Sequence, residues 1–243
     1  MPQAMVVAMS RFVLEPDAVA AQVGHPNFAR PTMSRISTGI TLALFALLIV
    51  ACSSGPSSLA GDPGAYEGTL LGAPAADFRL TDQDGARLTL SEFRGKVIVL
   101  TFMDSQCQDI CPLTASHLRA AYRTLGDDAR LVVLLGVNVN VAANTEADVA
   151  ATTRRWRLND IPTWHFLTGN SKELQPIWKA YNIAVAPNEG GEILHTPGVY
   201  LIDQTGQERW YVSTPFDSAG DSQGTAPLSE LLVKHIRELL SER

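Results

Sequence analysis

Apolar residues in the C-terminal two thirds of the chain form short runs that alternate with amphipathic stretches. Two runs, Val97–Met103 and Arg130–Val139, are almost continuously apolar and rich in β-branched residues. Such runs are typical of strands buried on both faces of a sheet. Pro112–Leu125 instead spaces its apolar residues by three and four, which predicts an amphipathic helix opened by a proline.

The remaining elements continue this alternation. In chain order we expect a hairpin of strands at Ala76–Leu80 and Arg87–Leu90 around a turn at Asp82–Gly85, a helix at Thr145–Trp156, a strand at Thr163–Leu167, a helix at Ser171–Tyr181, a second hairpin of Val199–Ile202 and Arg209–Val212, and a helix at Leu228–Leu240. This order predicts an α/β fold with a central mixed sheet, helices on both faces and an N-terminal β-hairpin.

A different apolar segment lies upstream. Ile40–Ala51 is a run of 12 apolar or small residues that follows Arg35. It is shorter than the roughly 20 residues of a membrane-spanning helix, but it suits the apolar region of a signal peptide. The run ends in Ala51-Cys52, which resembles a bacterial lipobox. The resemblance implies an exported protein anchored to the cell membrane by a lipid on Cys52; an uncleaved anchor helix is the alternative.

The residues around this segment suggest the organisation of the chain. Residues 1–32 contain acidic residues and prolines without periodicity, whereas Met33 begins a better signal sequence. Ser, Gly and Pro dominate after Cys52, as in flexible linkers. We therefore divide the chain into a gene-model artefact or unstructured leader at 1–32, a lipoprotein signal peptide at 33–51, a flexible tether at 52–69 and a folded domain at 70–243.

Composition narrows the functional classes. The 243 residues are 46% hydrophobic and 18% charged, with a net charge of −6, which suits one globular domain plus a targeting segment. Without a basic patch, nucleic-acid binding is set aside. If Cys52 carries lipid, Cys107 and Cys111 remain as a pair. In an oxidising compartment such a pair forms a disulfide or a metal site.

Cys107 and Cys111 follow a buried strand and stand where a helix begins, with Pro112 directly after them. The partial positive charge of a helix N-terminus stabilises thiolates, the form that binds metals or attacks disulfides. In a helical turn, residues i and i+4 have Cα atoms about 6 Å apart, within the range for a disulfide. The two sulfurs can therefore bind one metal ion or bond to each other.

The segment Cys107–Pro112 is similar to the copper-site motif of the Sco/SenC family, thioredoxin-like copper chaperones for cytochrome c oxidase assembly. That family adds a histidine before a late strand, and here His195 stands eight residues before Asp203 of Asp203-x-x-Gly206. The segment Trp164–Gly169 is also similar to a family segment. The resemblance spans roughly residues 70–243.

The resemblance implies a thioredoxin-like fold and a copper ion bound by Cys107, Cys111 and His195. It also implies delivery to the copper-bearing subunit of cytochrome c oxidase or to another copper or thiol partner. Soft thiolates select Cu(I), and imidazole suits both oxidation states, whereas a structural zinc site takes four ligands. His165 is expected to be structural. For two acidic residues near the site, Asp104 and Asp109, solvation at the surface is the favoured expectation, and electrostatic tuning of the copper site is the alternative.

Two features keep other functions open. Pro197 stands where thioredoxin-type oxidoreductases carry a cis-proline, and Val139–Thr145 lacks the acidic-proline pattern of the Sco/SenC family. The alternative is a membrane-tethered thiol-disulfide oxidoreductase, with Cys107 as the attacking thiolate, Cys111 as the resolving thiol and no need for His195. A peroxiredoxin-like peroxidase is less favoured, because no Thr-x-x-Cys sequence leads into Cys107.

Overall fold

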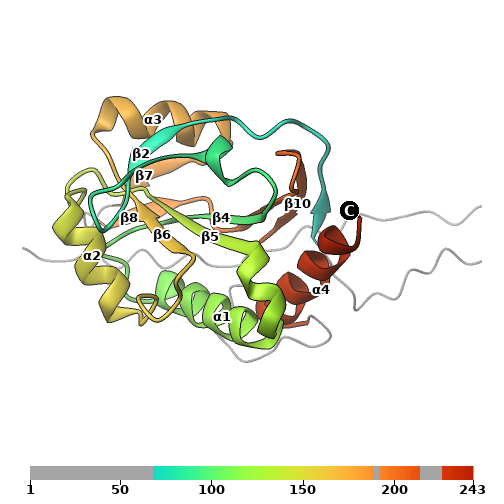
Figure 1. Cartoon of the computed structure of the whole chain (residues 1–243). Helices are drawn as coiled ribbons and strands as arrows, with labels where there is room; N and C mark the ends of the chain where they lie inside the picture. Colours follow the sequence, from blue (N-terminus) through green and yellow to red (C-terminus); the bar gives the residue numbers. More distant parts are fainter. Residues whose placement is uncertain (1–67, 189–191, 214–225, 243) are drawn as a thin grey trace, which may run out of the picture. The chain divides into compact units, whose positions relative to one another are not determined.

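The computed structural model describes residues 68–188, 192–213 and 226–242 (Figure 1). The predicted leader, the signal peptide, Cys52 and nearly all of the tether lie outside these residues. Within the described part of the chain, no helix is both long enough and apolar enough to cross a membrane.

The centre of the structure is a six-stranded sheet in the order β1-β10-β9-β4-β5-β6. Its strands are β1 (Thr69–Leu70), β4 (Val97–Met103), β5 (Val132–Asn138), β6 (Trp164–Leu167), β9 (Val199–Ile202) and β10 (Glu208–Val212). The pairs β4–β5 and β5–β6 are parallel, while β9 pairs antiparallel with β4 and with β10. The predicted mixed sheet is therefore confirmed.

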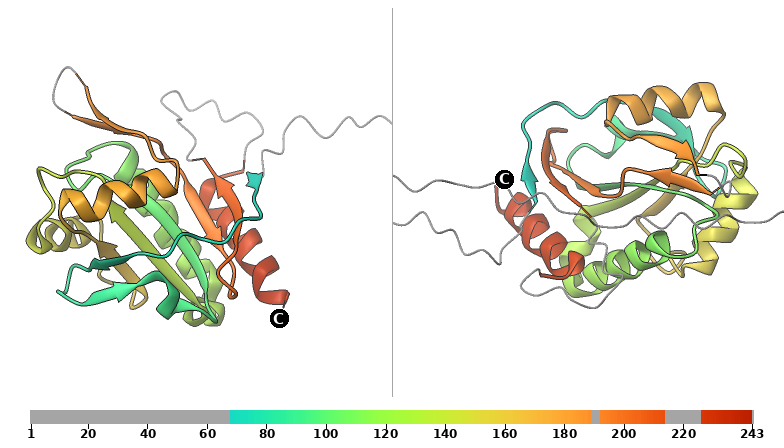
Figure 2. Two further views of the ribbon diagram at one scale, coloured as in Figure 1. Left: turned by 90° about the horizontal axis from the view of Figure 1, so that it is seen from above. Right: turned by 180° about the vertical axis from the view of Figure 1, so that it is seen from behind.

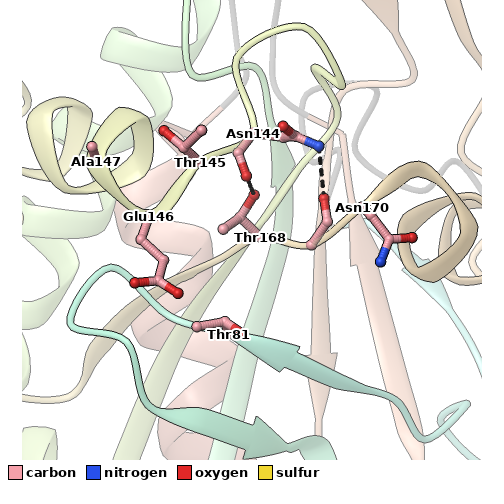
Figure 3. Close-up of a pocket in the computed structure, with 8 residues that line it drawn as sticks. Thr81, Asn144, Thr145, Glu146, Ala147, Thr168 and Asn170 are labelled. Carbon is pink, nitrogen blue, oxygen red and sulfur yellow. Dashed lines mark hydrogen bonds between the residues drawn. The ribbon is translucent and has the colours of Figure 1, made fainter.

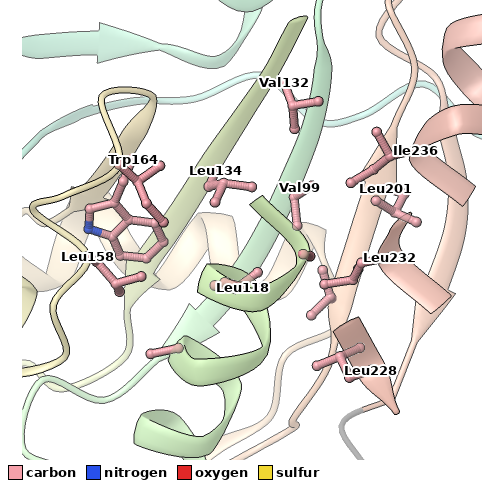
Figure 4. Packing of buried hydrophobic residues seen from close by; sticks show 14 of the residues in the cluster. Val99, Leu118, Val132, Leu134, Leu158, Trp164, Leu201, Leu228, Leu232 and Ile236 are labelled. Carbon is pink, nitrogen blue, oxygen red and sulfur yellow. The ribbon is translucent and has the colours of Figure 1, made fainter. Parts of the chain in front are cut away.

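Both faces of this sheet are covered (Figures 1 and 2). Alternate side chains of β4 point to opposite faces, as the two-residue period of a strand requires. Val99 packs with α1 and α4 on one face, and Leu100 packs on the other face in a cluster that includes α3. Figure 4 shows the first of these clusters. The helices are α1 (Ile110–Leu125), α2 (Glu146–Arg155), α3 (Ser171–Ala180) and α4 (Leu228–Ser241), with 3-10 turns at Leu90–Phe93 and Gly126–Leu131.

Two small hairpins lie outside the main sheet. The first consists of β2 (Arg79–Thr81) and β3 (Arg87–Thr89), as the sequence predicted. The second consists of β7 (Val185–Pro187) and β8 (Ile193–His195), and it was not predicted. Strands of three residues without a buried side chain give no readable alternation, which explains the omission.

The start of α1 also differs from the prediction. The helix begins at Ile110, two residues before Pro112, so Cys111 lies inside its first turn. Asp109 is the N-cap, and its carboxylate accepts a hydrogen bond from the Ile110 backbone N–H at 2.6 Å. An acidic N-cap of this kind satisfies one of the free N–H groups at a helix start. The second cysteine therefore has a fixed position relative to the helix axis.

Candidate metal centre

The two cysteines face each other across the first turn of α1. The Cys111 backbone N–H donates to Cys107 Sγ at 3.3 Å, so the sulfur of Cys107 lies against the positive end of the helix. Cys107 is half-buried, whereas Cys111 is only 2% exposed. Both are free thiols in this structure, and the predicted disulfide between them stays a prediction.

The protons of the pair are distributed unequally. A hydrogen bond from the Cys111 side chain, helped by the Cys111 backbone N–H, lowers the pKa of Cys107. The same hydrogen bond to Cys107, together with burial, raises the pKa of Cys111 well above its usual value. The outer sulfur therefore takes the thiolate form first, and the inner sulfur keeps its proton longer.

His195 lies beside Cys111 although the two are 84 residues apart in the sequence. Its Nε2 atom lies 3.8 Å from Cys111 Sγ, and its Nδ1 atom lies 3.0 Å from the Thr196 carbonyl oxygen. Because a carbonyl oxygen only accepts hydrogen bonds, Nδ1 carries the proton in the neutral ring. The lone pair of Nε2 is then directed at Cys111 Sγ, which is how a neighbouring acceptor orients a metal-binding imidazole. Burial lowers the pKa of His195, which favours this neutral form.

The spacing of Cys111 and His195 suits two ligands of one metal ion. An ion bonded to sulfur at about 2.3 Å and to nitrogen at about 2.0 Å, with about 120° between the bonds, needs donors about 3.7 Å apart. The observed separation between Cys111 Sγ and His195 Nε2 is 3.8 Å. Within the described residues, no three His, Cys, Asp or Glu side chains are yet gathered into a complete metal-binding arrangement. Cys111 is the donor that contacts both of the others.

A buried asparagine at the end of β5 supports the cysteine turn. The Asn138 side chain accepts hydrogen bonds from the backbone N–H groups of Ser105 at 3.3 Å and Asn140 at 3.1 Å. Its amide donates to the Ala143 carbonyl at 2.8 Å. Thr152 also donates to the Ser105 carbonyl, at 2.9 Å. The loop before Cys107 is thus fixed to the loop between β5 and α2.

Asp104 belongs to the same network, and the expectation that it is solvated was wrong. It is only 5% exposed, and its Oδ1 accepts hydrogen bonds from Gln106 N–H and Asn140 Nδ2, both at 2.8 Å. Asp109 is exposed as expected, but its carboxylate lies 3.1 Å from Cys107 Sγ. The polar residues Asn138 and Asn140 at the end of a buried strand were the sequence signal for this network.

The loop that follows His195 is attached to the main sheet. Thr196 N–H donates to the Ala184 carbonyl at 3.0 Å, and Ala184 N–H donates to Thr196 Oγ1 at 3.0 Å. Thr101 in the middle of β4 donates to the Gly198 carbonyl, also at 3.0 Å. Peptide bonds in the described residues are all trans, so Pro197 does not reproduce the cis-proline of thioredoxin-type oxidoreductases.

The other described histidines have partners elsewhere. His165 Nδ1 lies 3.0 Å from the Asp82 carboxylate, and His117 Nδ1 lies 3.5 Å from Ser229 Oγ. His235 is fully buried and stacks on Trp210 with ring centroids 4.1 Å apart. The contacts of all three agree with structural roles. His195 is therefore the histidine that meets the cysteine pair.

A polar cavity of about 510 Å³ lies at the starts of α2 and α3, away from the cysteines (Figure 3). Asn144, Thr168 and Gly169 in its wall bond one another. Asn144 Nδ2 donates to the Gly169 carbonyl at 2.9 Å, and Thr168 Oγ1 donates to the Asn144 carbonyl at 2.7 Å. These bonds join two loops at the sheet end.

Comparisons with known proteins agree with the fold. The SCO1 protein homolog of Bacillus subtilis is 24% identical over 176 residues, which cover 71% of this chain and 86% of the relative. A SCO1/SenC family lipoprotein from Bacillus anthracis superposes with a TM-score of 0.59 at 23% identity, over 71% of this chain and 98% of that structure. ScoI of Arabidopsis thaliana, solved with copper bound, gives 0.56 at 24% identity, over 68% and 99%.

These neighbours confirm the predicted thioredoxin-like fold. The resemblance that rests on Cys107–Pro112 and His195 spans roughly residues 70–243. The profile of the SCO1/SenC family matches residues 69–220, well over half of the chain. The chain therefore belongs to the SCO1/SenC family.

Proposed function

We propose that this protein is a copper metallochaperone that binds copper through Cys107, Cys111 and His195 and delivers it to the binuclear copper site of cytochrome c oxidase. The observation that carries the proposal is the unprotonated Nε2 atom of His195, 3.8 Å from Cys111 Sγ. Thiolate and imidazole donors together favour copper among the first-row metals. The copper-bound Arabidopsis relative supports it, and so does a structural neighbour described as a member of the Sco family of cytochrome c oxidase assembly proteins.

The unequal thiols suggest an order of binding. Cys107 is half-buried with a lowered pKa, so its thiolate meets an incoming copper ion first. Cys111 then gives up its proton, because metal ligation requires a thiolate. His195 is already neutral and oriented, and completes a site of three donors. A site with three donors leaves room for an acceptor's thiolate to bind copper before the first ligands leave.

A copper titration tests this assignment. We expect His195→Ala to lower the Cu(I) affinity of the reduced protein on the order of 100-fold, because it removes one of three ligands. His117→Ala is the matched control, since His117 is a half-buried histidine on α1 whose ring contacts Ser229. Affinity is measured by competition with a chromogenic chelator. Equal affinities for His195→Ala and the wild type would contradict the ligand set.

The proton distribution favours a second candidate, a thiol-disulfide oxidoreductase. A lowered pKa on the outer cysteine and a raised pKa on the buried one suit an attacking thiolate and a resolving thiol. In this function Cys107→Ser abolishes reduction of a model disulfide, while His195→Ala retains it. Reductase turnover without measurable copper binding would favour this candidate over the metallochaperone.

We further propose that the protein is exported and anchored to the cell membrane through a lipid on Cys52. The support is the order of positive charge, apolar run and Ala51-Cys52 in the sequence. Expression of Cys52→Ala is expected to release the protein from the membrane fraction and to abolish labelling with a fatty-acid probe. Unchanged fractionation and labelling would contradict lipidation.

A further inference from the structure

An acidic cavity opens beside the outer cysteine. It has a volume of about 600 Å³ and is lined by Cys107 together with Asp104, Asp109 and Glu192. Leu194, the neighbour of the proposed ligand His195, forms part of the same wall. Within the described lining there is no lysine or arginine, so the approach to the cysteine pair carries negative charge.

Exposed apolar side chains also stand next to site residues in the chain, and one of them, Leu194, lines the cavity. The large exposed hydrophobic residues of the described chain are Leu70, Leu113, Val141 and Leu194, at 64%, 39%, 44% and 59% exposure. Leu113 lies two residues after Cys111, and Val141 follows Asn140, which lines the cavity. Only Leu70 lies elsewhere, on the edge strand β1. We call Leu113, Val141 and Leu194 the apolar rim.

We propose that the apolar rim and the acidic cavity form the docking surface for the thiol-bearing segment of the copper acceptor, and that this segment presents apolar and basic side chains. The proposal rests on the metallochaperone function and specifies its partner. Apolar residues around a polar centre exclude water from a contact, as at the hot spots of protein interfaces. The acidic lining selects and steers a basic partner.

Docking at this surface would allow copper to pass directly from one protein to the other. A thiol of the acceptor loses its proton to solvent and its sulfur bonds to Cu(I). The bond from copper to a sulfur of this protein then breaks, and that thiolate takes up a proton. Copper stays Cu(I) throughout, so no oxidant or reductant is needed. The exchange requires both sets of sulfurs within bonding distance of one ion, which a docking surface around Cys107 provides.

Two synthetic peptides test the proposal. Both contain Cys-x-x-x-Cys, one flanked by leucine and lysine and the other by serine and glutamate. At low salt we expect the Cu(I)-loaded protein to transfer copper to the first peptide at least about 10-fold faster, with the advantage falling as salt rises. Leu194→Ser is expected to slow transfer to the first peptide several-fold. Leu70→Ser, an equally exposed leucine away from the site, is expected to leave the rate unchanged.

Other outcomes overturn the proposal. Equal rates for the two peptides, or equal effects of Leu194→Ser and Leu70→Ser, would contradict docking at the rim. A concentration-dependent dimer in sedimentation velocity that Leu194→Ser abolishes would show that a second copy covers the surface instead. Fluorescence anisotropy of Ser-for-Cys peptides on the copper-free protein measures docking without copper. A failure of copper binding is therefore distinguishable from a failure of docking.

Discussion

The two halves of the metal centre are built differently. The cysteine half continues from the central strand β4, and buried hydrogen bonds from Asn138 fix its loop to the loop after β5. The histidine half ends a three-residue strand in a hairpin outside the six-stranded sheet. It is attached through Thr196, whose side chain bonds Ala184 near the surface.

Because of this contrast, the stability of the fold and its affinity for copper are expected to depend on different residues. Breaking a buried hydrogen bond lowers the free energy of unfolding strongly, because it leaves a buried polar group without a partner. Breaking an exposed hydrogen bond changes it little, because water replaces the lost partner. We therefore expect changes in the cysteine half to alter the free energy of unfolding. Changes in the histidine half are expected to alter copper affinity with little effect on unfolding.

The largest effect is expected at Asn138. Asn138→Ala leaves the buried N–H groups of Ser105 and Asn140 without their acceptor, so the free energy of unfolding is expected to fall by about 3 kcal/mol. Asn159→Ala, an exposed control whose amide contacts only Asp160 among the described bonds, is expected to change it by less than about 0.5 kcal/mol. Urea unfolding measures both. A similarly small change in the free energy of unfolding for both variants would contradict the proposed difference between the two halves of the centre.

Asp104 gives the next largest effect. Asp104→Asn keeps an acceptor for Gln106 and Asn140 but removes a buried charge, and we expect a loss of about 1–2 kcal/mol. The raised pKa of Cys111 comes first from Cys107 and burial, and the Asp104 charge adds to it. The variant is therefore also expected to lower the pKa of Cys111, measured by alkylation rate against pH. A pKa that does not move would exclude an electrostatic role for Asp104.

The pH dependence of stability tests the burial of His195. Burial lowers its pKa in the folded protein, so the unfolded chain binds a proton more readily. Stability is therefore full above the unfolded pKa of about 6.5 and is lost as pH falls from there through the folded pKa. His195→Gln is expected to flatten this part of the profile, measured by urea unfolding between pH 7.5 and 5. Parallel profiles would show that His195 does not contribute.

Thr196 gives the smallest change in stability. Thr196→Val removes the side-chain acceptor for Ala184 N–H near the surface, at a cost of less than about 0.5 kcal/mol. Because this bond holds the residue next to His195, copper affinity is expected to fall several-fold. Thr124→Val, which removes an exposed hydrogen bond on α1, is the control and is expected to keep full affinity. If Thr196→Val lowered the free energy of unfolding but kept full copper affinity, the proposed difference between the two halves would be wrong.

Sequence patterns predicted the cysteine half better than the histidine half. The apolar run of β4 and the helical spacing of α1 predicted the strand–cysteine–helix order, because both elements are long enough to show their period. The short strands β7 and β8 show no such period. Only the resemblance to a known family pointed to His195, and the hairpin that carries it was missed.

The sequence shows polar residues at the end of β5, but it does not show that Asp104 is buried against them. Asp104 and Asn140 are 36 residues apart, and their contact depends on β4 and β5 pairing in register, Met103 opposite Asn138. A lone aspartate after a strand usually faces solvent. Its burial follows from the neighbouring strand end, whose position is a property of the folded sheet.

The attachment of the β7–β8 hairpin has a consequence for protein engineering. Its two strands pair only with each other in the described sheets, and residues 196–198 lead from it into β9, where Thr101 holds the Gly198 carbonyl. The hairpin can therefore be exchanged as a cassette between Ala184 and Gly198 while the six-stranded sheet keeps its own bonds. Replacing the donor at position 195 by methionine or cysteine would then retune metal selectivity on an unchanged scaffold.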